Sequence, residues 1–148
     1  MYFSNNLNDQ LKNRMGRADS INLQARKLFE RALRTGTKRR NANHALPNIS
    51  EASRKGQHYM GAQTVDIRCI GGSVNKSADF DIHFNPLSDH IEARWVKVAT
   101  AMLDGIDLPP IELILVKDTY YVVDGHHRIS VAHMLGIQFL DAIVTCWE

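Results

Sequence analysis

The chain lacks the features that would indicate a membrane protein, a secreted disulfide-rich fold or a zinc-stabilised fold. No uncharged apolar run approaches the roughly 20 residues that a bilayer-spanning helix needs. The first twenty residues contain no apolar core of a secretion signal. Cys69 and Cys146 are the only two cysteines, and they fit neither a zinc spacing nor a disulfide framework. We therefore expect a cytoplasmic protein with no membrane partner.

The sequence also lacks a P-loop, because Gly71–Gly72 is not followed by Gly-Lys-Ser or Gly-Lys-Thr. Its 148 residues suffice for one domain with a hydrophobic core and not for two full ones. Hydrophobic residues make up 44% and charged residues 23%, which is typical of a globular protein.

The net charge of +2 conceals an uneven distribution. Residues 1–40 contain ten Lys and Arg against three Asp and Glu, a balance of +7, and the remainder has eight against thirteen, a balance of −5. A basic segment joined to an acidic domain indicates one of two roles. Residues 12–40 bind a polyanion such as nucleic acid, or they dock on the acidic part of this chain or of a second copy.

Hydrophobic periodicity and turn residues predict an α+β protein. Residues 1–57 are expected to form a basic helical extension and a linker, and residues 58–148 a compact domain. Within the extension only 20–35 shows a helical pattern. In the domain the patterns predict strands at 64–70, 111–116, 120–123 and 139–146 and helices at 89–104 and 126–135.

The most informative segment joins a strand to a helix through Asp124-Gly125-His126-His127-Arg128. The first N–H groups of a helix have no internal partners, and the helix dipole adds positive potential there. Gly125 permits close approach of the backbone, and Arg128 has a donor geometry that suits phosphate oxygens. The segment therefore predicts an anion site, with phosphate as its ligand. In the alternative interpretation, Asp124 merely caps the helix and Arg128 pairs with a surface acid.

The order and spacing of several motifs resemble the ParB/sulfiredoxin-like family, including proteins of the "ParB-like nuclease" type. The resemblance depends on Asn85-Pro86 before the helix at 89–104, the strand within Leu108–Val116, the motif Asp124–Arg128, and Ser130-Val131-Ala132 with Leu135-Gly136. It implies a ParB/sulfiredoxin-like fold with a basic N-terminal helical extension. It also implies a nucleotide ligand (CTP, ATP or ADP) with Mg²⁺, bound by Gly125, His126, His127, Arg128 and Ser130. Because His126 stands where sulfiredoxin has its cysteine, sulfiredoxin activity is excluded.

Within this resemblance two enzymatic alternatives remain open beside a nucleotide-binding protein that hydrolyses its ligand slowly or not at all. The first is a small-molecule phosphotransferase like the free serine kinase, for which Glu112 or Asp124 would be the catalytic base. The alternative for Glu112 is an exposed strand residue beside a loop, and the alternative for Asp124 is a turn and cap residue. The second is a metal-dependent nuclease. Asp79, Asp81 and His83 alternate, and on a strand they would share one face suited to Mg²⁺; a solvated strand face is the alternative. We also expect the helical extension to support a homodimer.

Overall fold

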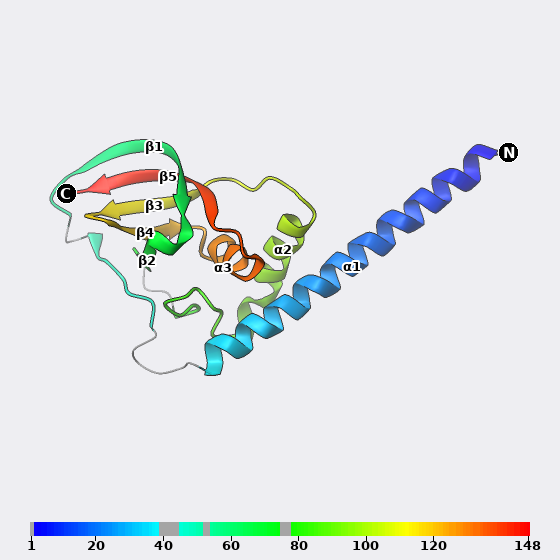
Figure 1. Ribbon diagram of the computed structural model, residues 1–148, viewed down its shortest axis with the longest axis horizontal. Helices are drawn as coiled ribbons and strands as arrows, with labels where there is room; N and C mark the ends of the chain where they lie inside the picture. Colours follow the sequence, from blue (N-terminus) through cyan, green and yellow to red (C-terminus); the bar gives the residue numbers. More distant parts are fainter. Residues whose placement is uncertain (1, 39–44, 52–53, 75–77) are drawn as a thin grey trace.

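A mixed five-stranded sheet and the helices packed on one side of it make up the body of the protein (Figure 1). The computed structural model describes residues 2–38, 45–51, 54–74 and 78–148, with only the backbone for residues 2–6. The elements are α1 (Tyr2–Lys38), β1 (Gln57–Asp66), η3 (Ile67–Cys69), β2 (Ile70–Ser73), η4 (Asp89–Ile91), α2 (Glu92–Leu103), β3 (Ile111–Val116), β4 (Thr119–Asp124), α3 (His126–Leu135) and β5 (Phe139–Trp147).

The sheet has the strand order β1-β5-β3-β4-β2. Strands β1–β5 and β3–β4 pair antiparallel, whereas β3–β5 and β2–β4 pair parallel. The helix α3 lies against the sheet, α2 packs on α3, and α1 packs on α2 (Figure 1). No helix among the described residues combines the length and hydrophobicity needed to cross a bilayer. The expected mixture of helices with a sheet is confirmed, and the finer ParB/sulfiredoxin-like assignment stays a prediction.

The hairpin and the helix that carries the motif match their predicted bounds closely. Lys117 in the β3–β4 turn has a φ of 56°, the left-handed conformation that a tight hairpin requires. The helix α3 ends where expected, because Gly136 has a φ of 72° and forms its C-cap. Local turn chemistry therefore determines both ends of this strand–turn–helix unit.

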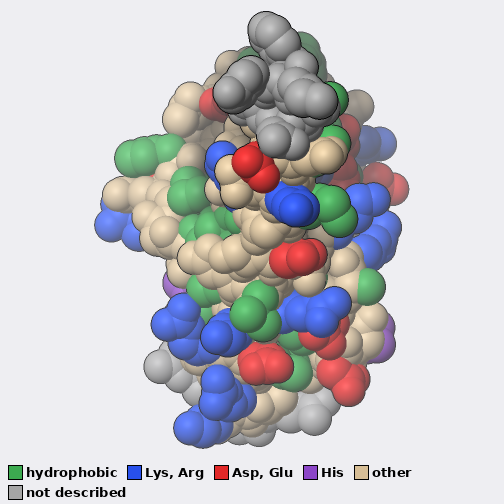
Figure 2. All heavy atoms as spheres, turned by 90° about the vertical axis from the view of Figure 1, so that its right-hand side faces the viewer, with side chains coloured by type: hydrophobic (Ala, Val, Ile, Leu, Met, Phe, Trp, Pro, Cys, Tyr) green, Lys and Arg blue, Asp and Glu red, His purple; other side chains and the backbone are tan. Residues whose placement is uncertain are grey.

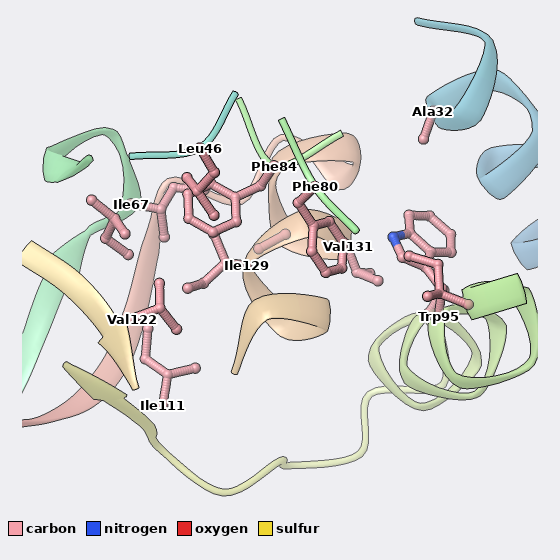
Figure 3. Close-up of a cluster of buried hydrophobic side chains, with 14 of the residues drawn as sticks. Ala32, Leu46, Ile67, Phe80, Phe84, Trp95, Ile111, Val122, Ile129 and Val131 are labelled. Atoms are coloured by element: carbon pink, nitrogen blue, oxygen red, sulfur yellow. The ribbon is translucent and has the colours of Figure 1, made fainter. Parts of the chain in front are cut away.

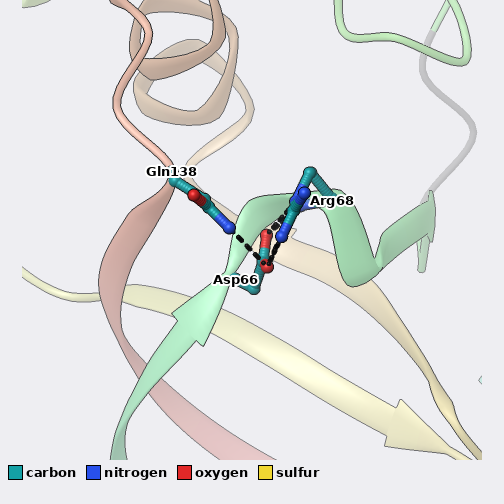
Figure 4. A network of polar contacts seen from close by, with 3 residues as sticks. All are labelled: Asp66, Arg68 and Gln138. Carbon is teal, nitrogen blue, oxygen red and sulfur yellow. Dashed lines mark hydrogen bonds and ion pairs between the residues drawn. The ribbon is translucent and has the colours of Figure 1, made fainter.

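The predicted single strand at 64–70 is wrong, because β1 starts earlier and the chain turns sharply after it. The Asp66 carboxylate accepts hydrogen bonds from the backbone N–H and the guanidinium of Arg68 and from the side-chain amide of Gln138 (Figure 4). The guanidinium of Arg68 holds the pKa of Asp66 far below its usual range. This network caps η3, which separates β1 from the short strand β2.

The segment before β1 was expected to be a linker, but its described residues pack against the domain. Leu46 is buried in the core, and Ile49 and Pro47 exchange backbone hydrogen bonds with Ser73 of β2. These contacts extend the sheet edge by a few residues, so 45–49 belong to the folded body. Arg39 and Arg40, part of the basic run, lie outside the described residues.

The helix α1 is far longer than the predicted 20–35, and it has two different halves. Its C-terminal half packs on α2 through the fully buried Ala25, Phe29 and Ala32, and the rings of Phe29 and Trp95 lie 5.4 Å apart. This half therefore belongs to the same core as the sheet. The N-terminal half projects from the body (Figure 1).

The core lies between the sheet, α3 and α2 (Figure 3). Trp95 of α2 is fully buried, and its indole N–H donates to the hydroxyl of Ser130 at 2.8 Å. Because a buried indole N–H without a partner would be costly, this bond fixes α2 against α3. The packing of α2 on α3 places one polar face of α2 beside the start of α3.

Candidate functional site

A cleft of about 450 Å³ opens at the N-terminus of α3. It brings together most of the predicted motif with residues of α2 and of the loop before it. The residues that line it are Asp79, Phe80, Arg94, Lys97, Val98, Asp124, Gly125, His126, His127 and Arg128. The predicted anion site therefore coincides with a cleft.

Gly125 makes the turn from β4 into α3 possible. Its φ is 116°, a conformation that residues with a side chain rarely adopt. A Cβ at this position would lie 2.5 Å from Cγ2 and 2.8 Å from Cβ of Ile111, which is buried. No side chain caps α3. The first-turn N–H groups therefore have no side-chain acceptor, and they carry the positive end of the helix dipole.

Arg94 and Lys97 add two exposed cations from α2 to the cleft. The sequence did not single out either residue, because neither belongs to the motif. Their spacing of three residues places them on the same face of a helix, and this signal was present in the sequence. Only the packing of α2 on α3 shows that this face borders the motif.

Arg128 is engaged in structural contacts, as the alternative interpretation of the motif proposed. One terminal nitrogen of its guanidinium donates to the carbonyls of Pro109 and Pro110, the latter at 3.0 Å, and the other donates to the Asp124 carboxylate at 3.0 Å. Its side chain is only 15% exposed. Arg128 therefore ties α3 to the chain before β3, and Asp124 pairs with it instead of capping the helix. A phosphate group would have to displace these partners to bind Arg128.

The two histidines of the motif are packed on Phe80. The ring of His126 stacks on it at 6.1 Å and that of His127 meets it edge-on at 5.3 Å. His126 Nε2 lies 2.8 Å from the Ser73 hydroxyl, whereas His127 Nε2 is buried without a hydrogen-bond partner in the described structure. Burial lowers the pKa of both imidazoles, and the nearby Arg94 lowers that of His127 further. Both rings are therefore neutral at pH 7.

Ser130 and Glu112 lie outside this cleft. The Ser130 side chain is buried in the core, where it accepts the Trp95 bond, so it is not available to a ligand. Glu112 is exposed on β3, paired in register with Asp124, and does not line the cleft. The structure therefore does not place Glu112 where a catalytic base for a ligand in the cleft would be needed.

The proposed metal ligands Asp79, Asp81 and His83 do not form a site, because this segment is not a strand. The Asp81 carboxylate is buried and accepts hydrogen bonds from the backbone N–H groups of His83 and Asn85 and from the Asn85 amide, at 2.9–3.1 Å. Asp79 instead pairs with His90 at 3.0 Å. No group of three His, Cys, Asp or Glu side chains in the described parts of the chain is arranged to hold a metal ion.

Comparison of the chain with protein-family models, curated proteins and solved structures finds no match. The function therefore has to be inferred from the geometry of the cleft and the residues around it.

Proposed function

We propose that the cleft at the N-terminus of α3 binds a nucleotide through its phosphate groups. The observation that carries the proposal is the convergence of an uncapped helix N-terminus with Arg94 and Lys97 in a single cleft. Each component attracts anions, and together they surround the same space. In this proposal Arg94, Lys97 and the N–H groups of the first turn of α3 hold the phosphates.

The neutral state of the histidines shapes the expected ligand contacts. His126 and His127 supply ring surfaces and nitrogen atoms at pH 7, not positive charge. A bound phosphate would favour their protonated forms, since an adjacent negative charge raises the pKa of a histidine. Binding is therefore expected to take up protons and to tighten as the pH falls.

The size of the cleft favours a nucleotide over a lone phosphate ion. Its volume of about 450 Å³ lies within the roughly 300–1,000 Å³ of typical small-molecule sites. Val98 and Phe80 supply apolar surface beside the cations. The resemblance to the ParB/sulfiredoxin-like family supports CTP, ATP or ADP as the ligand.

Mg²⁺ fits this site as part of the nucleotide complex, not as an ion held by the protein alone. Mg²⁺ is commonly bound by one or two carboxylates together with substrate phosphates. Asp79 and Asp124 both line the cleft, although each already has an ionic partner. The same carboxylates favour a phosphotransferase as the second candidate, with Asp124, 70% exposed at the cleft, as the candidate base.

The proposal is tested by isothermal titration of the full chain with CTP, ATP, ADP and inorganic triphosphate, each with and without Mg²⁺. Losing one charged contact is expected to weaken binding about tenfold or more, so Arg94→Ala and Lys97→Ala should each do so. Arg31→Ala, an equally basic and exposed residue far along α1, is the matched control and should bind normally. Absence of binding to all four ligands by the unmodified chain would refute the proposal. Release of inorganic phosphate or of a phosphorylated acceptor would distinguish the phosphotransferase from a binding protein.

A further inference from the structure

A stripe of apolar side chains runs along α1 and continues beyond the part of the helix that is covered. Leu7, Leu11, Ala18, Ala25 and Phe29 follow one another at intervals of four or seven residues and therefore share one helix face. Ala25 and Phe29 are buried against α2. Leu7 and Leu11, on the same stripe, are 59% and 48% exposed. The stripe is thus continuous, but only its C-terminal part has a partner within the chain.

The apolar stripe of α1 loses its partner within the chain where α2 ends. Arg17 forms an ion pair with Asp104, at 3.5 Å, just beyond the C-terminus of α2. Residues 2–16 project past this point (Figure 1). An isolated helical segment of this length is only marginally stable in water, and its several asparagines and Gly16 are poor helix formers. Helices of this kind owe their stability to packing of their apolar face, so the projecting segment requires a partner.

A groove that would suit such a helix runs along the seam between α1 and α2. It consists of two adjoining clefts, of about 750 Å³ and about 330 Å³, which share Thr100. The α1 side of the groove extends from Arg14 to Arg26. This span corresponds to about 18 Å, close to the length of the helical segment 7–18. Ala93 and Val96 of α2 give the larger cleft an apolar floor.

We propose that residues 7–18 of a second copy of this chain fill this groove, and that the exchange is reciprocal. The helix α1 carries both the uncovered stripe and one wall of the groove. A two-fold axis crossing α1 therefore allows each copy to fill the groove of the other with a single contact repeated twice. Two antiparallel α1 helices related by this axis would cross near residue 16.

The charges of α1 agree with burial of this face and not of the opposite one. The outward face of the C-terminal half of α1 carries four exposed basic residues, Lys27, Arg31, Arg34 and Lys38. Lys and Arg side chains lie among acidic, hydrophobic and other side chains in the lower half of the view in Figure 2. Two such faces would repel each other. The charged residues that line the two clefts are Asp89, Glu92 and Asp104 together with Arg14, Arg17, Arg26 and Lys97. Segment 7–18 is itself basic, with Asp9 against Lys12, Arg14 and Arg17. Charge therefore does not favour its binding, and the apolar stripe has to supply the affinity.

The oligomeric state of the full chain tests the proposal, measured by sedimentation equilibrium and light scattering. We expect a dimer that becomes monomeric in the variant Leu7→Glu/Leu11→Glu. Leu23→Glu is the matched control, because Leu23 is 54% exposed on α1 but lies off the stripe, and it should remain dimeric. Circular dichroism and thermal unfolding establish that each variant is folded. The proposal would be overturned if the unmodified chain were monomeric at a protein concentration of about 100 μM. It would also be overturned if Leu23→Glu dissociated the dimer to the same extent as Leu7→Glu/Leu11→Glu.

A second variant tests the groove separately from the stripe. Ala93 is exposed on the floor of the larger cleft, so Ala93→Arg would fill the groove without disturbing the core. We expect this variant to be monomeric as well. If it stays dimeric while Leu7→Glu/Leu11→Glu dissociates, the two projecting segments pair directly with each other, and the groove assignment is wrong. Because the proposal does not depend on nucleotide binding, it survives or fails independently of the function proposed above.

Discussion

Replacing Gly125 with alanine tests whether the start of α3 is built as described. The substitution has two separate costs. The backbone φ of 116° is unfavourable for a residue with a side chain, which costs about 1–2 kcal/mol. The new Cβ would also press on Ile111, at 2.5 and 2.8 Å. Since Ile111 is 1% exposed and cannot move into solvent, overpacking adds about 1–3 kcal/mol.

The free energy of unfolding of Gly125→Ala should therefore fall by about 2–5 kcal/mol, a large part of the stability of a typical domain. Urea unfolding followed by circular dichroism measures this loss. Gly105→Ala and Gly136→Ala are matched controls, because both glycines have a positive φ near 70° but no atom within 4 Å of the Cβ position. Those variants should lose only the backbone contribution of about 1–2 kcal/mol.

The comparison between the variants isolates the contact with Ile111. If Gly125→Ala destabilises the protein no more than the two controls, the close approach of the turn to β3 is refuted. If all three variants unfold at the wild-type urea concentration, the left-handed backbone assigned to these glycines is refuted too. Either result would remove the structural reason for a glycine at the mouth of the cleft.

Three further predictions concern the groups around the cleft. Arg128→Ala should lower the free energy of unfolding by about 1–3 kcal/mol in urea titrations, because it removes the hydrogen bonds that tie α3 to the chain before β3. Asp81→Ala should lower the free energy of unfolding at least as much, by about 2–4 kcal/mol, because buried N–H groups of Asn85 lose their charged acceptor. A decrease of less than about 1 kcal/mol would show that other groups replace the lost hydrogen bonds. The contribution of His126 and His127 to stability should be fully present above the ordinary histidine pKa of 6.5 and should be lost as the pH drops below it, because the unfolded chain then binds protons that these buried histidines resist. The combined variant His126→Asn/His127→Gln should show a smaller slope between pH 6.5 and 5 than the unmodified chain, and an unchanged slope would contradict the assignment.

The sequence alone predicts those elements whose structure depends on local turn and capping residues. The hairpin, α3 and its C-cap Gly136 follow from turn residues and periodicity, and the structure confirms them. The motif also led to the cleft. Arg128, by contrast, has the same residue type whether it binds phosphate or backbone carbonyls, and only the course of the chain at Pro109 and Pro110 distinguishes the two roles.

Long-range packing accounts for the rest of the differences. A strand-like alternation at 79–83 was misleading, because Asp81 turns inward to bond the backbone of its own loop. The helix α1 extends past its periodic segment into an asparagine-rich stretch whose own residues favour other structures. Arg94 joins the cleft only because α2 packs on α3, a contact that no local pattern encodes.

The central claim is that Arg94 and Lys97 bind the phosphates of the ligand, whereas Arg128 stabilises the folded structure. One paired measurement tests it most directly: nucleotide affinity by isothermal titration and urea midpoint for Arg94→Ala/Lys97→Ala and for Arg128→Ala. We predict that the double variant loses nucleotide binding with an unchanged midpoint, and that Arg128→Ala keeps binding within about tenfold at a lowered midpoint. The reverse pattern, with binding lost only in a fully stable Arg128→Ala, would contradict the account.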